Sequence, residues 1–300
     1  MTEYHAHPQA GQRHVLGEGP VWVSETSTLI WVDVERGTVF EGTLVEGVVE
    51  PIRQLDFDGR VGAAVPSEDG DILVATENRL LVVTPDGKRL NGPVIVAPGV
   101  ASRANDGACD PAGRVLIGTL ALDGREGEET LHRLETDGSL TVVDSDLTLS
   151  NGIAWSPDGA LMYSTDTAPG IIWVRDYNVE SGEIGPRRQH LHIEAGYPDG
   201  ICTDAQGNLW VAIWGEGEVR SFDPSGRHTD TVFVNAPHVS SVAFVGDELD
   251  TLLITTASRD LDGPDLLTYP DAGRLFLADV GATGMPSTRW VFAGTRAAVH

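Results

Sequence analysis

Short apolar runs alternate with turn residues along the whole chain. One stretch, LSNGIAWSPDG at 149–159, has a polar residue before a glycine, then an apolar strand and a Ser-Pro-Asp-Gly turn. Related segments are GEGPVWV at 17–23, VGAAVPS at 61–67, NDGACDP at 105–111, PDGICTD at 198–204 and SSVAFVG at 240–246. Equivalent positions in successive segments lie 41 to 48 residues apart. Strand-like units with such a period are typical of a β-propeller.

Each repeat contains further strands with turn residues between them. Second strands are predicted within 69–76, 112–119, 158–165, 206–213 and 250–256, and third strands follow each of them. We therefore predict an all-β protein: a six-bladed β-propeller with four-stranded antiparallel blades around a central channel, formed by residues 1–300 as a single domain. No stretch has sustained helical periodicity, so little helix is expected.

The last blade of a propeller is usually completed by a strand from a chain end. Near the N-terminus, residues 13–16 have the pattern of a short strand, and near the C-terminus residues 289–293 do. We expect strands from these two regions to close the ring.

A column of small or medium-sized side chains supports this alignment of the repeats. It stands three residues after the polar position, where innermost strands crowd near the axis and large side chains do not fit. Its members are Val21, Ala64, Cys109, Ala154, Cys202 and Ala243. The two cysteines belong to repeats that are not neighbours, so we interpret them as reduced packing residues rather than as a disulfide or a metal pair.

The chain is strongly acidic, with 45 Asp and Glu residues against 20 Lys and Arg residues and a net charge of -25. Such a charge repels phosphate backbones and anionic lipid, so we expect neither nucleic-acid nor membrane partners. It also favours solubility or adaptation to salt. Neither a signal peptide nor a membrane-spanning run is recognisable, and we expect a cytoplasmic protein.

The polar position of the repeat predicts a site at the axis. Residues at the starts of innermost strands can project into one mouth of the channel, and carboxylate and amide oxygens suit a hard divalent cation such as Ca²⁺, Mg²⁺ or Mn²⁺. Asp or Asn before Gly is also an ordinary turn former. A site is favoured because four of the six positions carry oxygen donors, namely Glu18, Asp106, Asn151 and Asp199.

Several segments together resemble one known family. They are GEGPVW at 17–22, RANDGACDPAGR at 103–114, SNGIAW at 150–155, YPDGICTDAQGNLWVA at 197–212, SRDLDGP at 258–264 and FAG at 292–294. In this order and spacing they resemble the senescence marker protein, regucalcin and gluconolactonase family of six-bladed propellers. The resemblance implies hydrolysis of a sugar-acid lactone. It also implies one divalent metal ion (Ca²⁺, Zn²⁺, Mg²⁺, Mn²⁺ or Fe²⁺) held by Glu18, Asn151 and Asp199.

The same resemblance implies roles for residues beside the metal. Arg103 and Asn105 match family positions that bind the substrate, and Asp106 matches a residue close to the metal. Either Asp199 or Asp106 would act as the general base, while the metal polarises the lactone carbonyl. The family's mammalian members carry an acidic pair after the position of Thr119. This chain reads LALDG at 120–124 instead, and Asp123 is the candidate replacement.

Three functions fit these residues. The leading prediction is a metal-dependent aldonolactonase whose partner is a small sugar lactone, working as a monomer or a weak homo-oligomer. A phosphotriester hydrolase of similar propeller type is the second, and a non-catalytic calcium-binding propeller is the third. Arg103 and Asn105 count against the third, because a scaffold has no use for them beside a metal.

Overall fold

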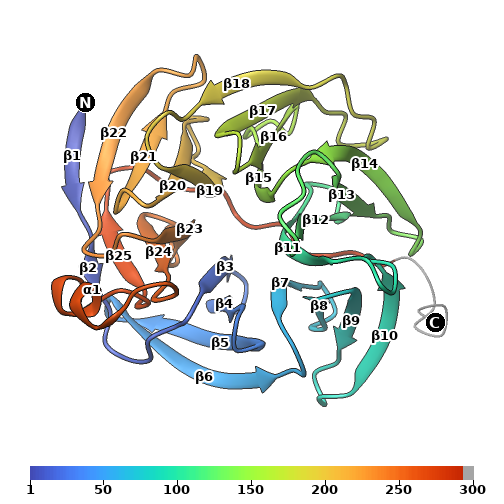
Figure 1. Cartoon of the computed structure of the whole chain (residues 1–300), viewed down its shortest axis with the longest axis horizontal. Coiled ribbons are helices and arrows are strands. Elements are labelled where there is room, and N and C mark those ends of the chain that lie inside the picture. The colour runs from blue at the N-terminus through green and yellow to red at the C-terminus, as the bar shows by residue number, and fades with distance from the viewer. Residues whose placement is uncertain (293–300) are drawn as a thin grey trace.

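The chain forms a ring of six β-sheets around a central axis (Figure 1). The structure is a computed structural model, and it describes residues 1–292. Four of the sheets are simple antiparallel meanders of four strands, which run from the axis outwards in chain order. The predicted six-bladed propeller with four-stranded antiparallel blades is therefore confirmed.

The first three blades come from the N-terminal half of the chain. Blade 1 contains β3 (Gly17–Val23), β4 (Thr28–Asp33), β5 (Thr38–Val45) and β6 (Val48–Asp56). Blade 2 contains β7 (Val61–Pro66), β8 (Ile72–Thr76), β9 (Arg79–Val83) and β10 (Arg89–Val94). Blade 3 contains β11 (Ser102–Cys109), β12 (Val115–Ala121), β13 (Glu129–Leu134) and β14 (Leu140–Leu147).

The other three blades complete the ring. Blade 4 contains β15 (Ser150–Trp155), β16 (Leu161–Asp166), β17 (Ile171–Asp176) and β18 (Arg188–His192). Blade 5 contains β19 (Tyr197–Thr203), β20 (Leu209–Trp214), β21 (Glu218–Phe222) and β22 (His228–Phe233), with β1 (Thr2–His5) added in parallel to β22. Blade 6 contains β23 (Val239–Val245), β24 (Thr251–Thr256), β25 (Phe276–Asp279) and β2 (His7–Pro8).

The hydrophobic core lies between adjacent blades. Every residue of β7 and β8 is buried, because each blade packs one face on the blade before it and the other on the blade after it. One buried cluster joins blades 1 and 2 and includes Val32, Val61 and Val74. Another joins blades 4 and 5. β7 and β8 therefore read as nearly continuous apolar runs, because both of their faces are covered.

The N-terminal region does complete the last blade, but with different residues from those expected. His7 pairs with Leu277 and Pro8 with Phe276, which makes β2 the outer strand of blade 6. Pro8 is tolerated there because the outer edge of a sheet needs no further hydrogen-bond donor. Residues 13–16 form no such strand; only Leu16 makes an isolated bridge, to Ala257. The prediction for 13–16 is therefore wrong.

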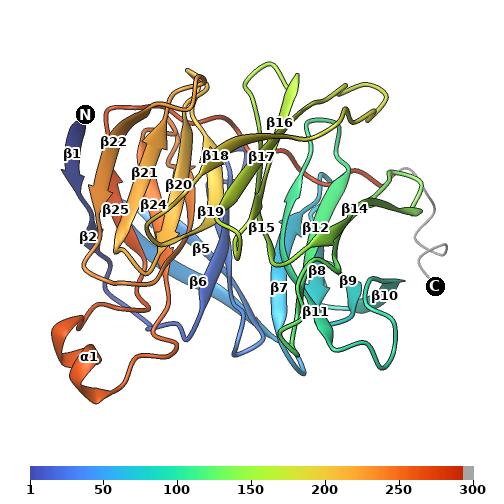
Figure 2. The same ribbon diagram turned by 45° about the horizontal axis from the view of Figure 1, so that its top comes forward.

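Residues 289–292 do not join the last blade. We call residues 283–291 the C-terminal strap, because they cross one end of the channel from blades 5 and 6 to blades 2 and 3 (Figures 1 and 2). At one end Gly284 N donates to Leu249 O over 2.7 Å, and at the other Trp290 N donates to Pro66 O over 2.8 Å. The expected pairing of 289–293 with the last blade is wrong for the part described, and Ala293 lies outside the described residues.

Helix is scarce, as expected. Within residues 1–292 the only α-helix is α1 (Gly263–Thr268), which Asp262 caps through a capping box and which projects from one side of the ring (Figure 2). No helix in this part of the chain is long and apolar enough to cross a bilayer.

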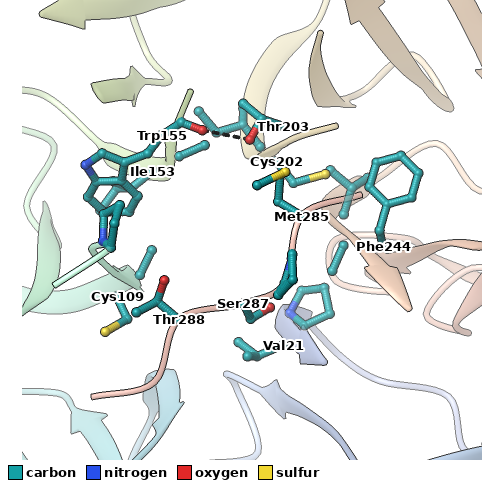
Figure 3. Close-up of a pocket in the computed structure, with 18 of the residues that line it drawn as sticks. Val21, Cys109, Ile153, Trp155, Cys202, Thr203, Phe244, Met285, Ser287 and Thr288 are labelled. Carbon is teal, nitrogen blue, oxygen red and sulfur yellow. Dashed lines mark hydrogen bonds between the residues drawn. The ribbon is translucent and has the colours of Figure 1, made fainter. Parts of the chain in front are cut away.

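The column of small side chains borders an axial cavity. The cavity has a volume of about 460 Å³, and the strap residues Met285–Thr288 line one end of it (Figure 3). Five column members line it, the exception being Ala64, which is packed in the core. They are Val21, Cys109, Ala154, Cys202 and Ala243. The small residues thus leave the axis partly open. Both cysteines are free and partly buried, and burial raises the pKa of each thiol.

Candidate functional site

The innermost strands of all six blades begin on the same face of the ring. Because neighbouring strands in a blade are antiparallel, each such beginning lies beside the end of the second strand. In blade 4, for example, Ser150 pairs with Asp166. The strap crosses the opposite face, where the innermost strands end. We call the first face the bulge face, for the irregularity described next, and the second the strap face.

Every innermost strand departs from regular pairing near its start. The register shifts lie between Glu18 and Val21, between Ala104 and Gly107, between Ser150 and Ile153, and between Pro198 and Ile201, with similar shifts in β7 and β23. A bulge of this kind inserts an unpaired residue and re-aims its side chain. The four predicted oxygen donors Glu18, Asp106, Asn151 and Asp199 are located at these bulges.

The glycines that follow the oxygen donors allow adjacent blades to approach closely. A Cβ atom on Gly152 would lie 2.5 Å from the carbonyl oxygen of Asp199, and one on Gly200 would lie 2.1 Å from Oγ of Ser241. Any side chain there would clash with the next blade. Asn151 and Asp199 lie within strands rather than in turns, so the turn-former interpretation does not describe them.

The carboxylates at the bulges influence one another although they come from blades 1, 3 and 5. Burial, followed by repulsion from Asp199 and Asp106, raises the pKa of Glu18 well above its ordinary value. Burial and Asp106 likewise raise the pKa of Asp199. Burial raises the pKa of Asp106 to about 6, although the N–H of Gly107 donates to its Oδ1 over 2.7 Å. A divalent cation would reverse these shifts by favouring the charged forms.

One oxygen of this group has no protein partner. Oδ1 of Asp199 is buried and accepts no hydrogen bond within residues 1–292. A buried carboxylate oxygen without a donor is costly unless a cation or a proton satisfies it. In the same residues, no group of three or more His, Cys, Asp or Glu side chains is arranged to hold a metal ion, and the predicted set contains only two carboxylates beside the Asn151 amide. The carboxylate and amide oxygens of Glu18, Asn151 and Asp199 are ligands that a hard divalent cation prefers.

Arg103 and Asn105 are connected to Asn151 by hydrogen bonds. Nη1 of Arg103 donates to Oδ1 of Asn105 over 2.7 Å, and Nδ2 of Asn105 donates to Oδ1 of Asn151 over 3.0 Å. All three side chains are buried. Burial lowers the pKa of Arg103 to about 10, which leaves it charged at neutral pH. The structure therefore brings these three predicted residues together.

Asp123 is not connected to the cluster. It lies in the loop after β12, and both of its carboxylate oxygens accept from Nη1 of Arg125 over 2.9 Å. Arg125 also forms an ion pair with Glu129 over 2.7 Å. Within residues 1–292 no hydrogen bond joins Asp123 to Arg103 or Asn105, so its role as a substrate contact stays a prediction.

The sequence analysis missed an ion-pair cluster on the bulge face. Both oxygens of Glu35 are used: Nε of Arg60 lies 2.8 Å from one, and Nη1 of Arg259 lies 3.0 Å from the other. Burial is the main cause of the lowered pKa of Arg103; Glu35 opposes it, and the charges of Arg60 and Arg259 add to it. Its members come from blades 1, 2 and 6 and carry no common motif, so the sequence alone gives no signal for it.

Two aromatic rings stack beside this cluster. Trp214 at the end of β20 lies parallel to His238, with ring centroids 4.2 Å apart and an angle of 4° between the planes. Nδ1 of His238 lies 3.0 Å from the backbone oxygen of Arg259. Tyr197 pairs with Trp214 but is exposed. These rings belong to the rim of the bulge face.

Thr167 was also missed. It follows β16 directly and is buried, and its hydroxyl contacts the side chain of Asn151 and the backbone of Pro198. Nothing in the local sequence marks it, but the pairing of β15 with β16 places the residue after Asp166 beside the bulge. Thr167 can be found by aligning the end of each predicted second strand with the polar-Gly position of the strand before it.

Comparison with known proteins gives consistent relatives. Pentonolactonase XacC of Haloferax volcanii is 34% identical over 281 residues, which cover 91% of this chain and 94% of that protein. Regucalcin of Danio rerio is 31% identical over 281 residues, covering 92% of this chain and 94% of that protein. Among solved structures, a luciferin-regenerating enzyme superposes with a TM-score of 0.88 at 27% identity, covering 96% of this chain and all of that one.

The family assignment rests on most of the chain. Residues 16–258 match the family described as "SMP-30/Gluconolactonase/LRE-like region". This range runs from just before Glu18 to the end of blade 6's second strand, and it contains all the bulges described above. The chain belongs to the SMP-30/gluconolactonase/LRE-like family.

Proposed function

We propose that this protein is a divalent-metal-dependent lactonase that opens the ring of a sugar-acid lactone. The observation that carries the proposal is the buried oxygen cluster at the bulges, with Oδ1 of Asp199 unpartnered and Asn151 hydrogen-bonded to Asn105. A relative named as a pentonolactonase, similar over nearly the whole chain, supports the substrate class.

Glu18, Asn151 and Asp199 would hold the metal ion. When bound, it supplies Lewis-acid polarisation of the lactone carbonyl. The residues of the chain provide an environment shielded from bulk water, in which a charge developing on the carbonyl oxygen is stabilised more strongly than in solution. Their backbones are fixed in strands of three different blades, so the site is rigid before substrate arrives.

Arg103 would bind and orient the substrate. Its Nη1 is already used by Ala104 O and Asn105 Oδ1, at 2.9 and 2.7 Å. Within residues 1–292, Nε and Nη2 make no hydrogen bond, which leaves them to donate to substrate hydroxyl or ring oxygens. Both protons on Nδ2 of Asn105 are used, so that residue offers only its second Oδ1 lone pair. Asn105 therefore accepts from a substrate hydroxyl.

A carboxylate moves the proton during hydrolysis. The oxygen of water forms a bond to the carbonyl carbon, and the bond from this carbon to the ring oxygen breaks. The proton removed from water passes through the carboxylate to the departing alkoxide. Asp199 and Asp106 are the candidates. Asp106 lies outside the proposed ligand set and borders the axial cavity, and its Oδ1 is held by Gly107, which leaves Oδ2 for the proton.

The test is a lactone panel assayed with metal-free protein and again after addition of Ca²⁺, Zn²⁺, Mg²⁺, Mn²⁺ or Fe²⁺ in turn. We expect hydrolysis of at least one pentono- or hexonolactone that depends on an added ion. A phosphotriester in the same panel tests the second candidate function. No ion-dependent hydrolysis of any lactone would overturn the proposal.

A further inference from the structure

A single chain of hydrogen bonds links the proposed substrate residues to the proposed metal ligands. From Arg103 and Asn105 it continues through Asn151, whose Nδ2 donates to Oγ1 of Thr167 over 2.9 Å. Oγ1 of Thr167 in turn donates to the carbonyl oxygen of Pro198 over 2.8 Å. The chain crosses blades 3, 4 and 5 and ends one residue before Asp199.

The direction of every bond in this chain is fixed from both ends. A guanidinium can only donate, and a backbone carbonyl can only accept. The hydroxyl of Thr167 has one proton, which the Pro198 oxygen takes, so towards Asn151 it can only accept. The NH₂ group of Asn151 must therefore face Thr167, and its Oδ1 must face away from it. The bonds from Arg103 agree with this orientation but hold the amide only at its oxygen, and the Thr167 hydroxyl supplies the second point of contact, at the nitrogen.

This orientation matters because only the oxygen of an amide can bind a hard cation. Oδ1 of Asn151 accepts one hydrogen bond from Asn105 and keeps a second lone pair. The Thr167 backbone is itself fixed, with its N–H bonded to Leu149 O and its carbonyl accepting from Gly170, both over 3.0 Å. The hydroxyl thus occupies a fixed point between two blades.

We propose that Thr167 is a positioning residue that holds the Asn151 amide with its oxygen towards the metal centre and anchors the strand that carries Asp199. The proposal rests on the proposed function, because it takes Asn151 and Asp199 as ligands. Thr167 touches neither substrate nor metal in this account and acts through its two neighbours. Residues that orient metal ligands typically change metal affinity about 10- to 100-fold when they are lost.

The experiment compares Thr167→Val, which keeps the shape and removes the hydroxyl, with Thr167→Ser, which keeps the hydroxyl. Thr165→Val is the matched control. Thr165 lies on β16, two residues before Thr167, and is buried, and its hydroxyl has no hydrogen-bond partner within residues 1–292. Titration calorimetry with Ca²⁺ and with Mn²⁺ on metal-free protein measures affinity without turnover. We expect Thr167→Val to weaken binding by about 10- to 100-fold. Thr167→Ser and Thr165→Val should stay close to the wild-type protein.

Repeating the Thr167 substitution in an Asn151→Asp variant separates a role in orienting the amide from general support of the fold. In Asn151→Asp both side-chain oxygens can bind a cation, so the orientation of the group no longer matters. Thr167→Val should then cost little additional affinity. An equal loss of metal affinity in the wild-type and Asn151→Asp proteins would assign Thr167 to structural support and overturn the proposal.

The remaining outcomes are also decisive. Wild-type affinity in Thr167→Val would overturn the positioning role while leaving the proposed function intact. A wild-type protein that binds neither ion would overturn the metal centre itself, and the positioning role with it. If Thr167→Val does not fold by circular dichroism, Thr167→Ala replaces it. Failure of both to fold would assign the residue to stability and overturn the proposal.

Discussion

The two faces of the ring use the same dipeptide for opposite purposes. On the bulge face, Asp199 before Gly200 is buried inside a strand, and burial and a neighbouring carboxylate raise its pKa. On the strap face, Asp158 before Gly159 lies exposed in a turn. There, hydrogen bonds from Ser156 and from the backbone of Ala160 lower the pKa of Asp158. Asp-Gly is therefore ambiguous by itself, and the structural context at each end of the strand decides its role.

The difference arises from what surrounds each carboxylate. Asp158 accepts bonds that a turn supplies locally, which stabilise its charged form. Asp199 is placed where a bulge aims it at other blades, and Oδ1 receives no bond within the described residues. Local hydrogen bonds satisfy the turn carboxylate, whereas the bulge carboxylate keeps an oxygen that only a proton or the proposed cation would satisfy. The predictions below test this contrast.

The largest effect is expected for Asp199→Asn, with Asp158→Asn as its counterpart on the other face. Loss of a proposed metal ligand and candidate base should lower lactone turnover by about 10²- to 10⁴-fold. Asp158→Asn should leave turnover unchanged, because asparagine also suits the turn. Steady-state kinetics at saturating metal, with circular dichroism to verify folding, measures both. Turnover near wild type in Asp199→Asn would locate the centre elsewhere.

Next in size is the effect of Trp290→Ala on the strap. Trp290 is 3% exposed and packs in the core of blades 2 and 3. Truncation should reduce the free energy of unfolding by about 3–5 kcal/mol through lost burial and the cavity left behind. Urea unfolding checks this, with the partly exposed strap residue in Met285→Ala as a milder control. Metal affinity should not change; a large loss would show that the two faces are coupled.

A smaller effect is expected when pH is varied on metal-free protein. Asp106 has an ordinary pKa of 3.8 when unfolded and about 6 when folded, so between these values the folded state binds more protons. Stability therefore falls as pH rises through this window, by about 2–3 kcal/mol in total. Urea midpoints between pH 4 and 7 measure the slope.

Two controls sharpen the pH experiment. Asp106→Asn should reduce the slope, because this group no longer titrates and only Glu18, Asp199 and the general repulsion of the acidic chain contribute. A bound divalent cation should oppose the fall, because it favours the charged carboxylates. A slope unchanged in Asp106→Asn would show that this carboxylate is not held protonated at the bulge face.

Regular features of the fold were predictable from the sequence. The repeat gave the number of blades, since each carries its own apolar strands and turns, and the polar-Gly pairs marked the innermost strands. The column of small residues was found, but its role as the lining of a cavity was not, because spacing does not reveal whether side chains meet across an axis. That residues 1–300 form a single domain stays a prediction.

Features that depend on pairing between distant segments were not predictable. The two residues of β2 are too few, and include a proline, so their pattern does not resemble a strand. The sequence around Trp290 has the pattern of a strand. In the structure, however, Trp290 N donates to Pro66 O at the end of β7, and Val291 N donates to Gly113 O in the turn after β11. The Glu35 cluster joins three blades without a common motif, and Thr167 stands out only after the second strands are aligned with the bulges. Each of these contacts is set by the ring rather than by local preference.

The pairing of β2 with β25 also constrains the protein during its synthesis. His7 and its partner Leu277 are 270 residues apart along the chain. At about 5–20 residues per second, roughly 15 to 60 s separate the two on the ribosome. Throughout that time the N-terminal segment has no partner strand in blade 6. The ring can close only after Leu277 has been made, and the strap residues follow it within a few positions.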